Sequence, residues 1–263
     1  MKSCDLPDTQ NNEDLRQIVI DKVGIKDIAH PITYVSRDGD KIATVGNFTM
    51  TVELPEHIKG THMSRFIEIL NQGDCEFNSG NFDKIIDKVR QKLESDTAHI
   101  IVDFPFFRKK KAPSSGVESL MDYQVTLYGE LEKGKSEVMM KVVVPVTSLC
   151  PCSKSISKYG AHNQRSHITI KAKPTLGKQL HVEDLIDLAE RMASCELYAI
   201  LKREDEKLVT ERAYDNPAFV EDLVRDIAVE LNKDDRINYY RLESENFESI
   251  HNHSAYAVIE HQK

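Results

Sequence analysis

Apolar residues recur along this chain with two spacings, and the two spacings alternate in a regular order. Residues 41–54 alternate apolar and polar positions, which predicts a half-buried strand. Met63, Phe66, Ile67 and Leu70 then follow the i, i+3, i+4, i+7 spacing of an amphipathic helix. The segments predicted in the first half are strands at 32–36, 41–54, 98–107 and 119–131, and two helices with apolar stripes at 63–70 and 82–93.

The second half of the chain repeats this order. Strand patterns cover residues 136–146, 166–173, 237–247 and 255–260, and helical stripes run from Val182 to Ala193 and from Val220 to Leu231. Asp215-Asn216 followed by Pro217 predicts the cap and first position of the second helix. Each half therefore reads strand–strand–helix–helix–strand–strand, a ββααββ order. This order predicts two α+β modules, each an antiparallel sheet with a helix pair on one face.

The predicted division of the chain has three parts. Residues 1–28 form an N-terminal part, in which the polar stretch 1–15 predicts a disordered tail and 16–28 a short helix. The first module covers 29–133 and the second covers 134–263. Because the far face of each sheet must be covered, the pattern also predicts oligomerisation.

Composition narrows the class of protein. The chain has 43 Asp and Glu against 35 Lys and Arg, which gives a formal net charge of −8. This balance argues against broad nucleic-acid or anionic-membrane binding. No run reaches the ~18 apolar residues of a membrane span, and the N-terminus lacks the apolar core of a signal peptide. The five cysteines are odd in number and scattered, so we expect a cytoplasmic protein with reduced thiols.

Reactive side chains concentrate in the polar loop between the strand patterns 136–146 and 166–173. The loop contains Cys150, Cys152, Gly160 and His162. In extended backbone the two thiols, two residues apart, would point to the same face. They suit a metal ligand, a nucleophile or half of a strained disulfide, and equally a pair of small buried side chains. His162 suits acid–base work, or a structural hydrogen bond.

Further candidate groups lie in the second half. His251 and His253 precede the last strand and suggest a metal or phosphate role, or a polar turn. Glu206 lies in a charge run that also reads as a solvated surface. Glu221 lies one turn into the last helix, where a carboxylate can accept two parallel hydrogen bonds from a planar ligand.

Two basic stretches could meet phosphate. Residues 59–65 open the first helix, where Thr61 or Ser64 could cap and free N–H groups attract anions. Arg108-Lys-Lys-Lys111 precedes a predicted loop, and it reads as a solvated run or as a local anion trap. The chain has no phosphate-binding Gly-x-x-x-x-Gly-Lys loop, no dinucleotide fingerprint and no Gly-x-Ser-x-Gly elbow.

Several of these stretches together resemble one family. Ser148-Leu-Cys-Pro-Cys-Ser-Lys154 and Gly160-Ala-His-Asn-Gln-Arg-Ser166 closely resemble the signature of GTP cyclohydrolase type IB, the prokaryotic first enzyme of folate synthesis. The likeness continues in residues 59–66, 209–217 and 250–253 and spans about residues 30–260. Ser155 departs from the pattern, since an acidic residue is expected there.

The resemblance implies a fold, an assembly and a reaction. The fold is the tunnelling fold, with two ββααββ modules per subunit and homotetramers whose active sites lie at subunit interfaces. The reaction converts GTP and water to 7,8-dihydroneopterin triphosphate and formate. It uses one divalent metal, zinc, manganese or iron, which activates the water that attacks C8 of the guanine.

The resemblance also assigns roles to residues. It makes Cys150, Glu206 and His251 the metal ligands, with Glu204 and His253 as near competitors. His162 moves protons and Glu221 anchors the guanine, and Cys152 either supports the metal ligands or is an alternative ligand. Triphosphate and substrate-loop contacts are expected from Thr61, His62, Ser64, Arg65 and Lys111.

Three alternatives remain open at this stage. The nitrile reductase of queuosine synthesis shares the fold but uses a cysteine nucleophile and NADPH without a metal. A non-catalytic metal-binding assembly module would close its metal site with four ligands and would not bind guanine. A thiol–disulfide switch through Cys150 and Cys152 would lose metal on mild oxidation and could coexist with catalysis.

Overall fold

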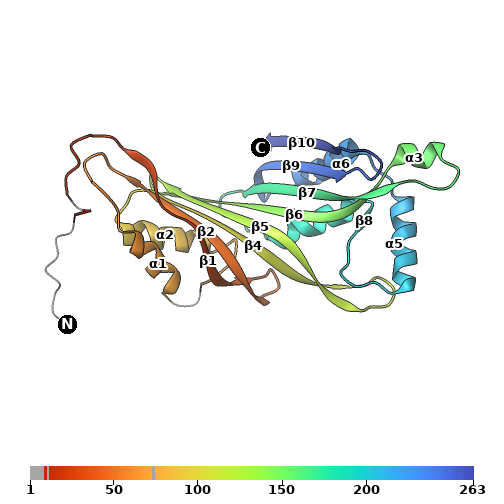
Figure 1. The fold of residues 1–263 in the computed structure, drawn as a ribbon, viewed down its shortest axis with the longest axis horizontal. Helices are drawn as coiled ribbons and strands as arrows, with labels where there is room; N and C mark the ends of the chain where they lie inside the picture. Colours follow the sequence, from red (N-terminus) through yellow and green to blue (C-terminus); the bar gives the residue numbers. More distant parts are fainter. Residues whose placement is uncertain (1–8, 11, 73–74) are drawn as a thin grey trace. The chain divides into compact units, whose positions relative to one another are not determined.

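Strands, most of which bury alternate side chains, contain more residues than the helices do (Figure 1). The computed structural model describes residues 9–10, 12–72 and 75–263. Its strands hydrogen-bond in the order β10-β9-β7-β6-β5-β4-β2-β1-β3, with β8 paired to β6. Strands β1 and β3 pair in parallel, whereas the pairs β2–β4, β6–β7, β6–β8, β7–β9 and β9–β10 are antiparallel. Helices accompany these strands, so the predicted α+β class is confirmed. No described helix is long and apolar enough to cross a membrane.

The elements in chain order are β1 (Ile20–Val35), β2 (Lys41–Leu54), α1 (Met63–Asn71), β3 (Glu76–Phe77), α2 (Phe82–Leu93), β4 (Ala98–Lys111), β5 (Glu118–Glu132), β6 (Lys135–Leu149), α3 (Pro151–Ile156), β7 (Asn163–Pro174), α4 (Val182–Met192), β8 (Cys195–Glu196), α5 (Arg203–Asp215), α6 (Val220–Lys233), β9 (Ile237–Phe247) and β10 (Ser254–Gln262).

The chain divides into two compact units, and four strands contribute to both. Unit 1 takes its described residues from 1–35, 43–104 and 127–138, and unit 2 is made of 36–42, 105–126 and 139–263. Consequently β2, β4, β5 and β6 each have one stretch in unit 1 and another in unit 2, and in β2 the unit 2 stretch is only residues 41–42. Neither unit is one continuous part of the chain, and the predicted boundary at 133/134 falls in the turn between β5 and β6.

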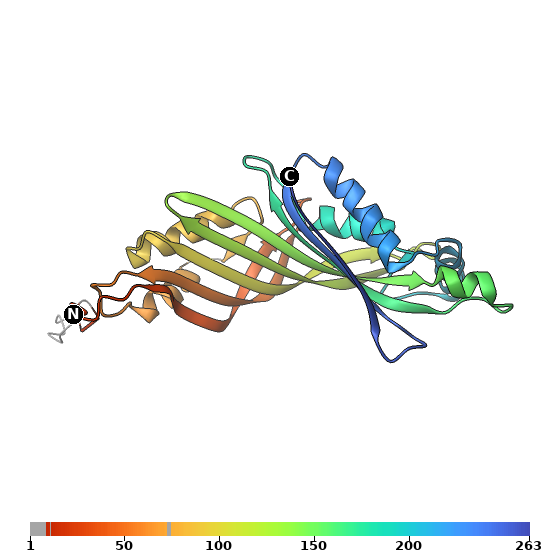
Figure 2. The ribbon, with the colours of Figure 1, turned by 90° about the horizontal axis from the view of Figure 1, so that it is seen from above.

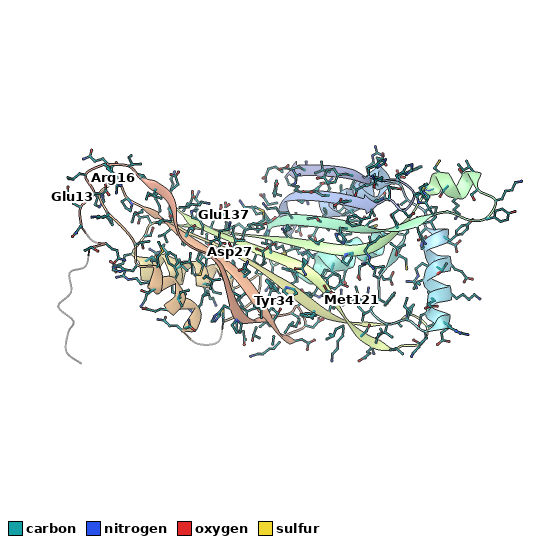
Figure 3. All side chains as sticks on the ribbon, viewed as in Figure 1. Glu13, Arg16, Asp27, Tyr34, Met121 and Glu137 are labelled. Carbon is teal, nitrogen blue, oxygen red and sulfur yellow. The ribbon has the colours of Figure 1, made fainter. Side chains whose placement is uncertain are left out.

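Unit 1 packs α1 and α2 against its strands through an aromatic core. Tyr34 (Figure 3) lies with its ring centroid 5.3 Å from that of Phe104, and Phe77 lies 5.3 Å from Phe82. All four side chains are at most 1% exposed. Gly129 on β5 leaves room for α2, because an added Cβ would come within 2.3 Å of the Ile86 side chain, which would have to shift.

Unit 2 places α4 and α6 on one face of its strands (Figure 2). The inward side chains of β6 and β7 alternate as predicted, and Val142, Val144, Ile168 and Ile170 are fully buried. Antiparallel ladders join β6 to β7, β7 to β9 and β9 to β10. Burial of one apolar stripe on each helix closes this core.

The N-terminal part differs from the prediction. Residues 20–28 belong to strand β1, so the predicted helix over 16–28 is wrong. Gly24 explains part of the difference, because a Cβ there would lie 2.0 Å from the carbonyl oxygen of Met50 on β2. The described part of the predicted disordered tail pairs with a neighbouring segment, since the Asp14 N–H donates to the His57 carbonyl at 3.1 Å. The rest of that tail lies outside the described residues.

Helix starts also differ from the prediction. Asp215 ends α5 and Asn216 is its C-cap, whereas α6 begins at Val220 after Phe219. Asp222, in the first turn of α6, accepts a hydrogen bond from the Phe219 N–H at 3.3 Å and does the capping that we expected of Asp215-Asn216.

Candidate active site

A pocket in unit 2 collects most of the predicted chemistry. The cavity measures about 420 Å³, and Cys150, His162, Glu221 and His251 all line it. These residues come from four places in the sequence: the end of β6, the start of β7, the first turn of α6 and the turn between β9 and β10. The fold therefore brings together one thiol, two imidazoles and one carboxylate from these four residues. Cys152 and His253 also line the pocket.

Cys150 occupies the junction between β6 and α3. It is the N-cap of α3, with Pro151 at the first helical position, and its Sγ accepts from the Ser153 N–H at 3.4 Å. The Cys150 N–H donates to the His162 carbonyl at 3.2 Å, which ties the two ends of the loop together. The backbone is extended at Cys150 but helical from Pro151, so the same-face arrangement of an extended chain does not apply to the two thiols. Cys152 belongs to α3 and is exposed.

Helix α3 is held from a distant part of the chain. Lys154 donates to the Tyr214 carbonyl and places its ammonium 4.2 Å from the centre of the Tyr214 ring. Tyr214 is near the end of α5, so α3 and α5 lie side by side at this end of unit 2 (Figure 1). The Ser153 hydroxyl further accepts from the His162 N–H at 3.2 Å.

The remaining described thiols are unsuited to ligation or catalysis at neutral pH. Burial raises the pKa of Cys195 to about 11, and the neighbouring Glu196 carboxylate adds to the shift. Burial also raises the pKa of Cys75 to about 11. Because the thiolate is the nucleophile and the metal ligand, both groups stay inert. Cys150 and Cys152 are the described thiols that line the pocket.

Glu221 and the histidine pair complete the pocket wall. Glu221 is the second residue of α6, where the helix dipole favours an anion. The Ala218 N–H donates to the Leu149 carbonyl at 3.2 Å, which fixes the start of α6 against the end of β6. The rings of His251 and His253 stack with centroids 5.1 Å apart.

Glu248 is a pocket residue that the sequence analysis missed. Its side chain is 14% exposed, and its Oε2 lies 3.8 Å from the Nδ1 of His251. Its Oε1 lies 3.4 Å from the Nε2 of Gln164, another lining residue. The available signal was the Glu-x-x-His spacing directly after the strand pattern 237–247.

Glu206 does not line this pocket. It is exposed on α5, as is its neighbour Glu204. Among residues 9–10, 12–72 and 75–263, no three His, Cys, Asp or Glu side chains converge in a metal-binding group. Of the three ligands suggested by the resemblance, the pocket contains Cys150 and His251.

Asp205, between the two exposed glutamates, is fully buried. It accepts from the Ser114 and Ser115 N–H groups and from the Lys202 N–H, each at 2.8 Å, and from the Ser115 hydroxyl at 2.6 Å. Burial raises the pKa of this carboxyl, but the donors, led by Ser115, outweigh it and hold the pKa well below its usual value. Asp205 therefore fastens the start of α5 to the loop after β4.

Asp205→Asn is expected to lower thermal stability at neutral pH, because an amide presents one acceptor oxygen to four donors. The folded pKa is depressed, so the ionised carboxylate contributes stability that is complete above the unfolded value of about 3.9 and is lost as pH falls toward the folded pKa. The gap in Tm between wild type and variant should thus shrink below about pH 4. Thermal unfolding across pH checks this, and a gap independent of pH would contradict it.

None of the predicted triphosphate contacts lines the unit 2 pocket. Thr61, His62, Ser64 and Arg65 belong to unit 1, where His62, rather than Thr61 or Ser64, is the N-cap of α1. Arg65 donates to the Lys92 carbonyl and to Glu94 at the end of α2, each at 3.3 Å.

The basic run is part of β4 rather than a loop. Arg108 pairs with Asp187, Lys110 with Glu190 at 2.8 Å, and Lys111 with Glu118 at 3.3 Å. All three cations thus have carboxylate partners, while the Lys111 side chain stays 74% exposed. Their partners are mostly distant in the sequence, which is why the run read as unpaired.

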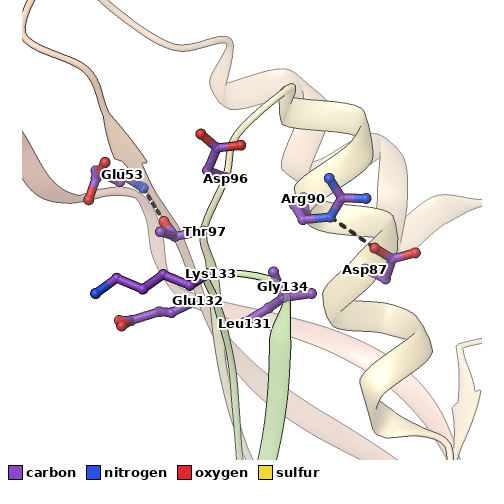
Figure 4. Close-up of a pocket in the computed structure, with 9 residues that line it drawn as sticks. All are labelled: Glu53, Asp87, Arg90, Asp96, Thr97, Leu131, Glu132, Lys133 and Gly134. Atoms are coloured by element: carbon purple, nitrogen blue, oxygen red, sulfur yellow. Dashed lines mark hydrogen bonds and ion pairs between the residues drawn. The ribbon is translucent and has the colours of Figure 1, made fainter.

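A cavity of about 590 Å³ in unit 1 contains none of the predicted site residues (Figure 4). Arg90 pairs with Asp87 at 3.0 Å, and the Glu53 N–H donates to the Thr97 hydroxyl at 2.9 Å. Two pairs of its polar lining residues thus bond to each other. The chemistry expected from the sequence lies in the unit 2 pocket instead.

Comparison with known proteins finds relatives along the whole chain. The family model described as type I GTP cyclohydrolase folE2 matches residues 6–257. The chain is 79% identical over 263 residues to the GTP cyclohydrolase FolE2 of Ruthia magnifica subsp. Calyptogena magnifica, with 100% of both chains covered. It is 58% identical over 258 residues to the GTP cyclohydrolase FolE2 of Nitrosococcus oceani, covering 98% of this chain and 96% of the relative.

Solved structures with a similar fold are urate oxidases. The enzyme of Bacillus subtilis 168 matches with a TM-score of 0.53 at 9% identity, covering 92% of this chain and 98% of that one. The enzyme of Bacillus sp. TB-90 matches with a TM-score of 0.53 at 10% identity, covering 93% and 100%. Identities this low show the fold alone, and the tunnelling fold of urate oxidases agrees with the predicted one.

Proposed function

The chain belongs to the FolE2 family of type I GTP cyclohydrolases, and on that basis we propose that it is a type IB enzyme that hydrolyses and rearranges GTP. The products are 7,8-dihydroneopterin triphosphate and formate, in the first step of folate biosynthesis. The observation that supports this most is the pocket shared by Cys150, His162, Glu221 and His251. Neither the nitrile-reductase nor the assembly-module alternative has support among the relatives.

Two of the three ligands that the resemblance suggests for a divalent metal line the pocket. A thiol and an imidazole, Cys150 and His251, line the same cavity, and such ligands suit zinc and iron. The third donor is a carboxylate: Glu206 from the resemblance, or Glu248 from its place beside His251. Zinc, manganese or iron bound there would polarise water and lower its pKa.

Other side chains of the pocket have separate roles in binding the guanine and in transferring protons. Glu221 accepts hydrogen bonds from the guanine N1–H and the exocyclic amine, which orients C8 toward His162. His162 takes and returns protons as the imidazole ring of the purine opens and the C8 carbon leaves as formate. Thr61, His62, Ser64, Arg65 and Lys111 remain the proposed contacts for the triphosphate.

We further propose that the chain works as a homotetramer with active sites at subunit interfaces. Apolar side chains around the pocket support this, because Ile156 is 78% exposed, Ile250 63% and Phe219 45%. A monomer rarely leaves such a cluster open to water. Light scattering of the purified protein measures its molar mass and so tests the proposed tetramer. The cytoplasmic location stays a prediction.

The direct test of the proposed function is GTP turnover by metal-stripped protein. Zinc, manganese and iron are added back separately, and formate release and the fluorescence of the oxidised pterin are followed together. Both products should form in equal amounts and only with metal. Tight metal binding without turnover would contradict the proposal and would favour a non-catalytic module.

Metal content of two matched variants identifies the carboxylate ligand. Glu206→Gln and Glu248→Gln each remove one charge and keep the side-chain length. The variant of the true ligand should lose most of its bound metal, because an amide oxygen is a poorer ligand than a carboxylate. Elemental analysis after dialysis gives the metal per chain. Full occupancy in both variants would rule out both assignments.

Glu221→Gln is expected to raise the KM for GTP by roughly 10- to 100-fold, the equivalent of one hydrogen-bond pair to a charged group. The metal content should stay unchanged. Asp222→Asn is the matched control, because Asp222 lies in the same helical turn but does not line the pocket. Equal KM values for the two variants would remove Glu221 from guanine binding.

A further inference from the structure

His162 is held by a chain of hydrogen bonds that runs from the pocket into the buried sheet. Its Nδ1 lies 3.0 Å from the Oε1 of Gln164. The Gln164 amide nitrogen lies 3.1 Å from the Ser148 hydroxyl, which in turn accepts from the Ser166 hydroxyl at 2.8 Å. Gln164, Ser148 and Ser166 are 8%, 2% and 0% exposed, so water does not compete for these bonds.

The surroundings of Gln164 determine which way its amide points. Glu248 Oε1 lies 3.4 Å from the Gln164 nitrogen, and an ionised carboxylate can only accept. Turning the amide over would place its oxygen against that carboxylate and lose the bond. The NH₂ group therefore faces Glu248 and Ser148, and the amide oxygen faces His162.

This orientation selects one tautomer of His162. Because the Gln164 oxygen can only accept, the Nδ1 of His162 must carry the proton and donate it. The Ser249 hydroxyl, 3.3 Å from the same nitrogen, can accept the same N–H as a second partner. The Nε2 then keeps its lone pair, and no hydrogen bond to it occurs within residues 9–10, 12–72 and 75–263.

We propose that Gln164 is a positioning residue that fixes His162 as the Nδ1–H tautomer and so presents a bare Nε2 to the pocket. A histidine ring that bonds through one nitrogen offers the other in a defined state and direction. The inference rests on the proposed function for its catalytic meaning, while the tautomer itself is a property of the protein without substrate.

Nitrogen NMR of zinc-loaded protein labelled with ¹⁵N-histidine tests the tautomer, at a pH where the ring is neutral. The signals of His162 are assigned by their loss in His162→Gln. We expect an N–H signal for Nδ1 and a bare-nitrogen signal for Nε2. A proton on Nε2 in the wild-type protein would overturn the inference, whatever the enzyme activity.

Two variants separate positioning from packing. Gln164→Met keeps the length of the side chain without an acceptor, and it should mix the tautomers and lower kcat by roughly 10- to 100-fold with little change in KM. Gln164→Glu keeps an acceptor for Nδ1 but brings two carboxylates together, so it should keep the tautomer while losing thermal stability. Both variants showing the wild-type tautomer would contradict the inference.

Ser244→Ala is the control for loss of a buried polar group. Ser244 is 0% exposed on the neighbouring strand β9, and its hydroxyl contacts Asn246 at 3.3 Å, not His162. It should leave the tautomer and kcat unchanged. If the wild type forms no pterin from GTP, the proposed function fails, but the spectra still decide the tautomer.

Discussion

Cys150→Ala is expected to lose its bound metal and its GTP turnover together. Cys150 is the proposed thiolate ligand, and alanine leaves the pocket without one. The loss of turnover should exceed the roughly 10- to 100-fold that removal of a residue behind a metal ligand costs. Metal content and formate release, measured on the same preparation, check the result.

Cys150 also caps α3, so a structural effect must be separated from a ligand effect. Cys150→Ser keeps an oxygen that can accept from the Ser153 N–H, and serine is a preferred N-cap residue. It should fold like the wild type and still lose metal. Cys152→Ala tests the second thiol, which belongs to α3 and is exposed to solvent. Full activity in Cys150→Ser would rule out the thiolate role.

His162→Gln is expected to lower kcat by roughly 10²- to 10⁴-fold, which is the usual contribution of a positioned acid–base group. Glutamine can still place a polar atom near Gln164, so the loop should keep its fold. The metal content should stay at the wild-type level, since His162 is not among the proposed ligands. Steady-state kinetics and elemental analysis check both points. Metal lost in step with activity would make His162 a ligand instead.

The alternation of buried and exposed positions was sufficient to predict most of the strands and four helices. The pattern at 237–247 has the same bounds as β9, and the stripes of α4 and α6 are buried as predicted. These elements each bury one face, and burial of one face is what periodicity reports. Helix α5 was missed because among its residues only Asp205 and Ala213 are buried.

The candidate site was predictable where a residue's role is local in the sequence. Cys150 and His162 stand close together in one loop, and the fold brings both to one pocket. The ion pairs of Arg65 and Lys110 were not predictable, because their partners Glu94 and Glu190 are set by tertiary packing. Gln164 was missed for the same reason, since its role depends on Glu248, which is 84 residues away.

The interleaving of the two units limits how this gene can be divided. A cut in the turn at 133/134 would leave the second fragment without residues 36–42 and 105–126, which belong to its own compact unit. Asp184 would lose Arg37, Glu190 would lose Lys110, and Asp205 would lose Ser115. Neither fragment should therefore fold by itself, and the halves are expected to work only when co-expressed. Although the chain reads as a repeated order of elements, neither half is an independent folding unit.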